Sequence, residues 1–95
     1  MRVKWLRRAL LNLDHEATYI AQENPNAAAE FVLLMRDSAL MLGQQPNLGR
    51  PGRIAGTREL VVANFPFILP YRVRNDTVEI LRVFHTSRKW PDIFK

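Results

Sequence analysis

Apolar residues recur at steps of three and four over two stretches in the first half of the chain, which is the period of one helix face. The first stripe joins Leu6, Ala9, Leu13, Ala17 and Ile20, and the second joins Ala28, Phe31, Val32, Met35, Ala39 and Leu42. Between them, Asn24 is suited to cap a new helix and Pro25 to occupy its first position. Gly43 and Pro46 end the second stripe. Because the connection is short, we expect an antiparallel helical hairpin.

The pattern changes in the second half, where three β-rich segments are separated by turns. The segments are "RELVVA", "FILPYRV" and "TVEILRVFH", and the turns are "NFPF" and "RND". Short links between consecutive strands favour an antiparallel meander. Pro70 cannot donate to a sheet ladder, so we expect its strand to be irregular there or that position to face no neighbour. "RVKW", at residues 2–5, is compatible with a further strand but is too short to assign alone.

These elements predict one α+β domain over residues 1–95, with the helical hairpin packed on one face of a small, three- to four-stranded antiparallel sheet. The absence of cysteine excludes disulfides, thiolate zinc sites and thiol nucleophiles, and it suits a reducing cytoplasm. No apolar run approaches the ~18 residues of a membrane span, and the apolar stretch at the start is too short for a signal peptide. We therefore expect a cytoplasmic protein without a membrane partner.

Charge is unevenly distributed along a chain of net charge +5. Acidic residues prevail between residues 9 and 49, whereas basic residues prevail from residue 50 to the end. Such a field suits nucleic acid or an acidic protein as a partner, although small basic proteins are common. The basic residues in or beside the predicted strands are Arg58, Arg72, Arg74, Arg82, Arg88 and Lys89. They form either a binding face or scattered solubilising charge, and Trp90 either joins an interface or packs the tail.

The segment "LGRPGRIAGTREL" combines glycine and arginine in a way that first suggests a phosphate cradle. A cradle needs its glycines between a strand and a helix, so that helix N-terminal amides point at the anion. Here the predicted order is helix, loop and strand. We therefore expect the glycines to turn the chain into the sheet, with Gly56 setting the entry to the strand that Arg58 begins.

The titratable residues give one candidate for chemistry. His15 has no ligands at metal spacing and is expected to be a solvated helix residue. His85, together with Arg88, can act as a general base and a charge stabiliser in RNA cleavage, or it can simply cap the adjacent loop. Glu59 and Glu79 are flanked by arginines, which predicts cross-strand ion pairs rather than an acid/base pair. No metal site and no cofactor are expected.

Four stretches, in this order, resemble toxins of the RelE/ParE superfamily of bacterial toxin–antitoxin modules, and more closely the ParE branch. They are "ATYIAQENPNAAAEFV", "LGRPGRIAGTRELVV", "YRV" and "ILRVFHTSRKWP". The resemblance as a whole extends over nearly the entire chain. The resemblance implies the same fold, with two helices over a small antiparallel sheet. It also implies a cognate antitoxin that wraps the toxin in a tight complex.

The two branches of the superfamily imply different activities. RelE-like toxins cut mRNA on the ribosome with basic residues and a C-terminal tyrosine or histidine. By position, Arg58 and Arg88 match basic groups of that site, but Ile68 and Phe94 stand where an arginine and the tyrosine are expected. Neither apolar side chain can move a proton. These two positions argue against cleavage of mRNA. Because His85 and Arg88 are still present, an mRNA endonuclease that relies on them, with Arg58, remains the alternative.

ParE-like toxins resemble poisons of DNA gyrase, which need a binding surface and no catalytic centre. We therefore expect a non-enzymatic toxin that blocks replication and arrests growth. The expected target-binding residues are Arg58, Arg72, Arg82, Arg88, Lys89 and Trp90. Whether the chain also binds nucleic acid directly stays open at this point, and a non-toxic basic binding module is a third interpretation.

Overall fold

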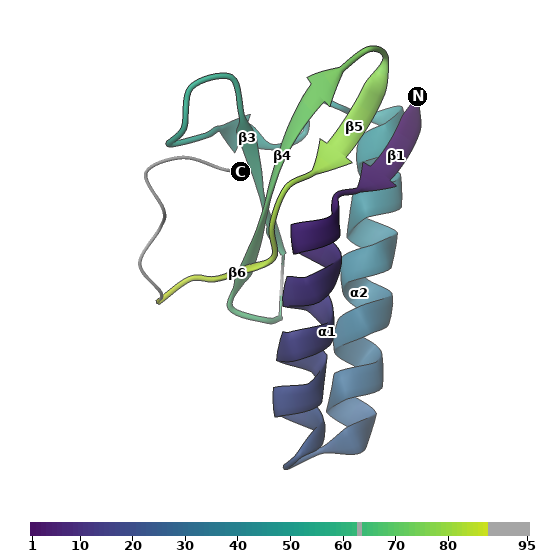
Figure 1. Ribbon diagram of the computed structural model, residues 1–95, viewed down its shortest axis with the longest axis vertical. Helices are drawn as coiled ribbons and strands as arrows, with labels where there is room; N and C mark the ends of the chain where they lie inside the picture. Colours follow the sequence, from purple (N-terminus) through teal and green to yellow (C-terminus); the bar gives the residue numbers. More distant parts are fainter. Residues whose placement is uncertain (63, 88–95) are drawn as a thin grey trace.

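Two long helices lie beside a sheet of short strands in the computed structural model, which describes residues 1–62 and 64–87 (Figure 1). Helix α1 spans Arg7–Ala21 and helix α2 spans Pro25–Gln44. The strands are β1 (Arg2–Trp5), β2 (Arg50–Pro51), β3 (Arg58–Val62), β4 (Phe67–Arg74), β5 (Thr77–Ile80) and β6 (Phe84–His85). Neither helix is long and apolar enough to cross a membrane, within this described part of the chain.

The helical hairpin is confirmed, and its turn uses the predicted residues. Asn24 caps α2 through its side-chain Oδ1, which accepts from the backbone N–H of Ala27 at 3.0 Å, and Pro25 is the first helical residue. The two helices run side by side along most of their length in Figure 1. His15 is exposed on α1, as expected for a solvated residue.

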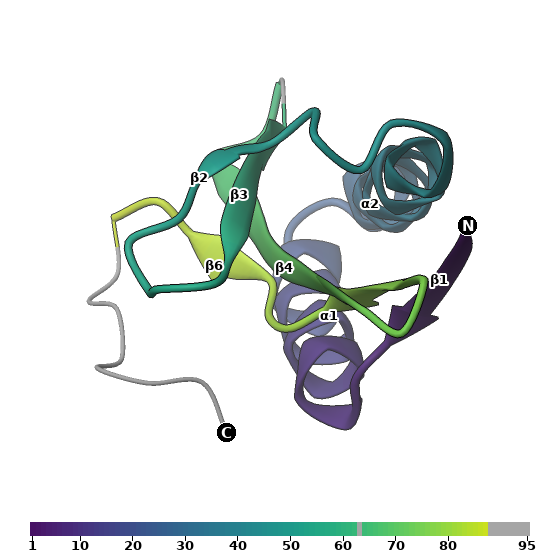
Figure 2. The same cartoon turned by 90° about the horizontal axis from the view of Figure 1, so that it is seen from above.

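The sheet is larger than predicted and is mixed rather than antiparallel. Its strand order is β1-β5-β4-β3-β2, and β6 pairs with β4 beyond the end of β5. Strand β1 lies parallel to β5, with Val3 opposite Val78 and Trp5 opposite Ile80. The prediction of a three- to four-stranded antiparallel sheet is therefore wrong in both size and direction. A parallel pair needs a long crossover, and the helical hairpin supplies part of it, so nothing local to β1 indicates its partner (Figure 2).

Pro70 lies where the ladder on one side of β4 is interrupted. Strand β4 pairs with β5 through residues 71–74 and with β6 through Phe67 and Ile68. Residues 81–83, between the two partners, belong to no strand. The carbonyl of Pro70 accepts from the N–H of Leu81 at 2.9 Å, but Pro70 has no N–H to return the bond. The predicted irregularity is thus present, although it falls in the neighbouring segment and β4 itself is continuous.

The core lies between α2 and the strands. Phe31 of α2 packs against Phe67 with ring centroids 4.8 Å apart and against Phe65 at 5.7 Å. Trp5 is partly buried against the same cluster. The buried apolar residues of this cluster are Ala9, Phe31, Met35, Ala39, Leu42, Val62, Phe67, Leu69, Tyr71, Val78, Ile80 and Val83. The second predicted stripe therefore packs against the sheet, while α1 adds fewer buried side chains.

Candidate partner-binding surfaces

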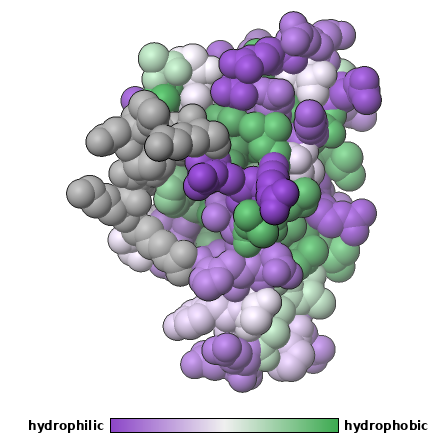
Figure 3. Space-filling model, viewed as in Figure 1, coloured by the Kyte–Doolittle hydropathy of each residue, from purple (hydrophilic) through white to green (hydrophobic). Residues whose placement is uncertain are grey.

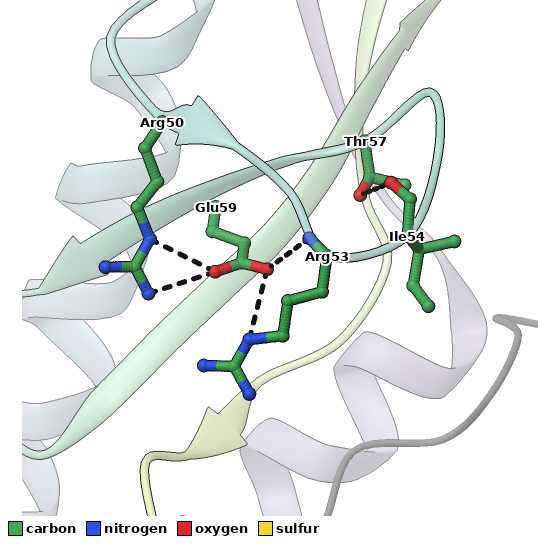
Figure 4. Close-up of polar contacts among 5 residues, drawn as sticks. All are labelled: Arg50, Arg53, Ile54, Thr57 and Glu59. Carbon is green, nitrogen blue, oxygen red and sulfur yellow. Dashed lines mark hydrogen bonds and ion pairs between the residues drawn. The ribbon is translucent and has the colours of Figure 1, made fainter.

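The glycine- and arginine-rich loop is organised around the carboxylate of Glu59 (Figure 4). Glu59 is only 2% exposed. Its Oε1 accepts from Nε and Nη2 of Arg50 at 3.2 and 3.0 Å, and its Oε2 accepts from the backbone N–H of Arg53 at 2.9 Å. The Nε of Arg53 lies 3.7 Å from the same oxygen. The predicted ion pairing of Glu59 is therefore confirmed, and it folds the loop over the start of β3.

Tyr71 fixes the other end of this loop. Its buried hydroxyl accepts from the N–H of Gly49 at 2.8 Å and donates to the carbonyl of Pro46 at 2.7 Å. Burial raises the pKa of Tyr71, against smaller opposing effects of the Gly49 bond and the charge of Arg58. A Cβ on Gly49 would lie 2.6 Å from the Tyr71 ring, so a larger residue cannot stand there. Gly56, at φ +79°, makes the turn into β3 as predicted.

Arg58 supports the loop instead of joining a basic face. Its Nη1 donates to the carbonyl of Gly49 at 2.7 Å and, at 3.5 Å, to that of Asn47. Its position in β3 has the same parity as those of Leu60 and Val62, whose side chains pack in or against the core. The sequence singled out Arg58 as a possible contact residue, and the structure gives it partners within its own fold.

An apolar groove of about 510 Å³ runs between α2 and β3. Helix α2 contributes Leu34, Ser38 and Met41, the loop and β2 contribute Leu48 and Arg50, and β3 contributes its last four residues. Met41, Leu48 and Val61 are among the large apolar side chains that remain exposed. A contiguous apolar surface of this kind marks a partner-binding site more often than a free surface.

The edge of β3 beside this groove is open. Strand β2 pairs only with Arg58 and Glu59, whereas β4 pairs with all five residues of β3. The backbone groups of residues 60–62 therefore lack a strand on that side, within the described part of the chain. An extended segment of another protein can add a strand at such an edge and place side chains in the neighbouring groove.

A basic surface lies at the opposite end of the sheet. Register places Lys4, Glu79 and Arg72 in one row across β1, β5 and β4. The next row holds Arg2, Thr77 and Arg74. Figure 3 shows hydrophilic residues gathered at the upper end of the molecule, where these strands lie in Figure 1. Of the predicted contact residues, this surface contains Arg72. Sequence reasoning missed Arg2 and Lys4, because their neighbours in space follow from the parallel pairing of β1.

Glu79 is the acidic member of the first row. Arg72 donates to its Oε1 from Nε at 2.6 Å, so the second predicted cross-strand pair is confirmed. That hydrogen bond lowers the pKa of Glu79, and the charges of Arg72, Arg74 and Lys4 lower it further. A single carboxylate thus sits among several cations, and the surface keeps a positive balance.

His85 lines a cavity of about 340 Å³ that also includes Glu16, Tyr19, Phe67 and Ser87. Its Nδ1 accepts from the backbone N–H of Ser87 at 3.2 Å and contacts the Ser87 hydroxyl at 2.7 Å. Since a backbone N–H can only donate, the proton of the neutral ring lies on Nε2. The geometry gives His85 the role of a cap on the following turn. Among the described residues, no group of three or more potential ligands is placed to hold a metal ion.

The remaining predicted positions fall in three places. Ile68 is buried in β4, where its partners across the sheet are Val61 and Phe84. Arg82 is buried in the segment between β5 and β6, close to the start of α1. Arg88, Lys89 and Trp90 lie outside the described residues, as does Phe94. The structure therefore brings together only part of the predicted contact set.

Comparisons with known proteins agree with this architecture. Residues 3–90 match the family model described as the ParE toxin of the type II toxin–antitoxin system parDE. The chain is 46% identical over 92 residues to the putative toxin Y4kP of Sinorhizobium fredii, covering 97% of this chain and 95% of that protein. It is 37% identical over 87 residues to toxin RelE2 of Caulobacter vibrioides, covering 92% and 97%.

A solved structure shows the same fold. It is a chain of the chromosomal ParDE toxin–antitoxin system from P. aeruginosa, which superposes with a TM-score of 0.85 at 29% identity. The likeness covers 92% of this chain and 97% of that one. The family match extends over almost the whole described fold, including both helices and the sheet. This chain belongs to the ParE family of toxins of type II toxin–antitoxin systems.

Proposed function

We propose that this chain acts as a poison of DNA gyrase and blocks replication without being an enzyme itself. Membership of the ParE family supports this function. The observation that carries it within the structure is Ile68, which is buried and pairs with Val61 and Phe84 where an endonuclease of the RelE type needs an arginine. An apolar cluster at that position cannot stabilise the charge that develops during phosphodiester cleavage.

The proposed gyrase contacts are the basic residues and the tryptophan of the C-terminal half. Arg72 belongs to the basic surface of the sheet, and Arg88, Lys89 and Trp90 are proposed from the sequence. Arginine and tryptophan are over-represented among residues that dominate interface energies. Arg58 and Arg82 are weaker proposals, because both already bond backbone carbonyls of the chain.

Purified toxin tests this function directly. We expect it to inhibit supercoiling by gyrase and to accumulate cleaved DNA held by the enzyme. Arg88→Ala and Trp90→Ala should weaken both effects, whereas Arg36→Ala, an exposed arginine of α2, should not. Unchanged supercoiling and no cleaved DNA with folded wild-type toxin would remove the proposal.

A toxin of a toxin–antitoxin system implies an antitoxin partner, and we propose that the antitoxin covers the groove between α2 and β3. The groove is apolar, borders an open strand edge, and includes the exposed residues Met41, Leu48 and Val61. A segment that folds on binding can add a strand to β3 and bury apolar side chains in the same groove.

Two matched substitutions test this placement. Met41 lines the groove, and Leu33 is exposed on α2 but lies outside it. We expect Met41→Glu to reduce antitoxin affinity by at least about tenfold while Leu33→Glu does not, since a buried, unpaired charge costs several kcal/mol. Equal affinities for the two variants, measured by calorimetry with the antitoxin encoded beside this toxin, would place the antitoxin elsewhere.

A ribosome-dependent mRNA endonuclease is the second candidate. It is favoured by the cavity that joins His85 to Glu16, Tyr19 and Ser87 and by the similarity to a toxin named RelE2. Primer-extension mapping after induction separates the two functions. New cuts within translated messages that disappear in His85→Ala would favour the endonuclease, and an SOS response with intact messages would favour gyrase.

A further inference from the structure

The basic surface draws its first two cations from β1, which lies beside β5 and close to β4 in Figure 1. Within β1, Val3 and Trp5 pack against the core. Because side chains alternate along a strand, Arg2 and Lys4 lie on the opposite face of the sheet, away from the core. Both of these cations are exposed.

Strand β4 contributes the second pair of cations to the same face. Tyr71 belongs to the core, and Arg72 and Arg74 lie one and three residues further along the strand. Arg72 shares a row with Lys4, and in the next row Arg74 is aligned with Arg2. Each row has one residue of β5 between its two cations. The usual spacing and rise of strands put these four positions at the corners of a rectangle of about 10 by 7 Å.

A cavity of about 510 Å³ adjoins these rows. Its lining combines three cations with an amide, a hydroxyl and a carboxylate, and the residues are Arg2, Val3, Lys4, Arg74, Asn75, Thr77 and Glu79. None of these lining residues is aromatic. The space beside the cations is therefore open to a polar ligand and offers no ring on which a base could stack.

Two carboxylates belong to the same end of the sheet. Glu79 accepts from Nε of Arg72 at 2.6 Å, and Asp76 is exposed in the turn between β4 and β5. The hydrogen bond from Arg72 lowers the pKa of Glu79, and nearby charges, including those of Arg74 and Lys4, lower it further. Cations of both strands therefore act on one carboxylate, and the surface keeps a positive balance.

We propose that the basic surface binds backbone phosphates of duplex DNA. Arginine and lysine, together with amide and hydroxyl groups such as those of Asn75 and Thr77, are the usual partners of phosphate oxygens. Cations spread over two rows and two strands suit a polyanion better than one anionic group. Single-stranded nucleic acid is generally held through aromatic stacking as well as charge. A lining without aromatic residues therefore favours a duplex.

Protection of a sheet edge is the competing explanation for part of this charge. Charged side chains on an edge strand keep it from pairing with other chains, and this role fits Arg2 and Lys4 of β1. It does not extend to Arg74, because β4 lies between β5 and β3 in the strand order. Arg74 is therefore the residue at which the two explanations differ.

This inference deepens the proposed action on gyrase, since it gives the toxin a contact of its own to DNA through a surface that includes Arg72. The choice of DNA over RNA rests on that proposed function. Binding is measured with toxin alone, so a negative result leaves the gyrase proposal standing. A toxin that binds the duplex but leaves supercoiling unaffected would remove the gyrase proposal and keep this one.

The test uses purified toxin and a fluorescein-labelled DNA duplex, with binding followed by anisotropy over a series of salt concentrations. Each phosphate contact that a variant loses should reduce the slope of log K against log salt by about 1. We expect this reduction, and a several-fold loss of affinity at low salt, for Arg74→Gln. Arg36→Gln makes the same change of charge at an exposed position of α2 and should leave the slope unchanged.

A substitution of the acid gives the opposite sign. Glu79→Gln removes a negative charge from between the cations, so we expect it to strengthen binding of the duplex several-fold at low salt. Glu30→Gln makes the same change at an exposed position of α2 and should have a much smaller effect, because salt screens distant charges.

The proposal is overturned if the duplex does not bind at low salt, or if Arg74→Gln and Arg36→Gln weaken binding equally. It is also overturned if Glu79→Gln, in the folded protein, does not strengthen binding more than Glu30→Gln does. Duplex RNA and polyglutamate are the remaining probes. If either one binds in a way that depends on Arg74 while the DNA duplex does not bind, the surface serves a different class of partner.

Discussion

Two groups of arginines differ in whether an acidic residue lies beside them. The loop arginines, Arg50 and Arg53, surround the buried carboxylate of Glu59. A second pair, Arg7 and Arg8, which we call the helix-start arginines, lies in the first turn of α1, which contains no acidic residue. The two groups differ in their local acid: Glu59 lies between the loop arginines, whereas the first turn of α1 has no acidic residue.

The difference shows what a count of basic residues conceals. A guanidinium whose partner is a buried carboxylate of its own chain supports the fold, and the carboxylate largely neutralises its charge. A guanidinium in the first turn of a helix is instead repelled by the positive end of the helix dipole. The loop arginines and the helix-start arginines should therefore affect the stability of the fold in opposite directions.

The strongest test of this comparison removes the central acid of the loop. Glu59→Gln loses the charge on which Arg50 and Arg53 converge, and we expect the free energy of unfolding to fall by about 1.5–3 kcal/mol. Glu30→Gln, at an exposed position of α2, should change it by less than about 0.5 kcal/mol. Urea unfolding measures both. Equal stabilities would show that the loop does not depend on Glu59.

A second test releases the loop from its other end. Tyr71→Phe removes the hydroxyl that bonds Gly49 and Pro46, and leaving these backbone groups unpaired should cost about 1–2 kcal/mol. Because the pKa of Tyr71 is raised on folding, its contribution is complete below the unfolded value of about 10 and is lost as pH rises through the folded value. Unfolding at increasing alkaline pH should therefore bring wild type and variant closer together. A constant difference would contradict the raised pKa.

The same substitution at one arginine of each group should change the stability of the fold in opposite directions. Arg50→Gln removes two hydrogen bonds to a buried carboxylate and should destabilise the fold by about 0.5–1.5 kcal/mol. Arg7→Gln removes a cation from the positive end of α1 and should stabilise it by about 0.3–1 kcal/mol at low ionic strength. Melting temperatures in a low-salt buffer without phosphate give the signs. A loss of stability in both variants would contradict the predicted difference between the two groups.

The smallest expected effect belongs to Glu79, which is an intermediate case because one carboxylate serves several cations. Glu79→Gln should cost about 0.2–1 kcal/mol at neutral pH, the usual range for a cross-strand pair. The pKa of Glu79 is lowered on folding, so its contribution is present above the unfolded value of about 4.3 and disappears as pH falls through the folded value. Unfolding near pH 7 and in acid checks this. A difference that grows in acid would contradict the assignment.

Much of the fold could be predicted from local pattern. Helical spacing and the Asn24–Pro25 cap predicted the hairpin, and Gly56 predicted the entry to β3. Arginines beside Glu59 and Glu79 predicted two ion pairs that the structure contains. These features depend on neighbours in the chain or on adjacent strands of a hairpin, so they can be predicted from the sequence.

The candidate surfaces were less predictable, because they depend on distant segments. Arg82 was noted as one basic residue among several, and only its contact with the first turn of α1 makes it part of a cavity. Arg58 was expected in a basic face, but its guanidinium bonds the carbonyl of Gly49. The groove beside β3 is formed by the exposed side of α2 and by the part of β3 that the short strand β2 leaves uncovered. The groove therefore cannot be predicted from any one segment of the sequence.

The sequence by itself determined the family, the helical hairpin and the strand-forming segments, because helical period, caps and turn residues act over a few positions. The tertiary structure alone decided that β1 joins the sheet in parallel and brings Arg2 and Lys4 beside Arg72 and Arg74. It also decided that Arg50 and Arg53 meet the carboxylate of Glu59 and that Arg72 meets that of Glu79. Those outcomes depend on the distance between charges in space, and folding sets that distance through contacts between residues far apart in the chain.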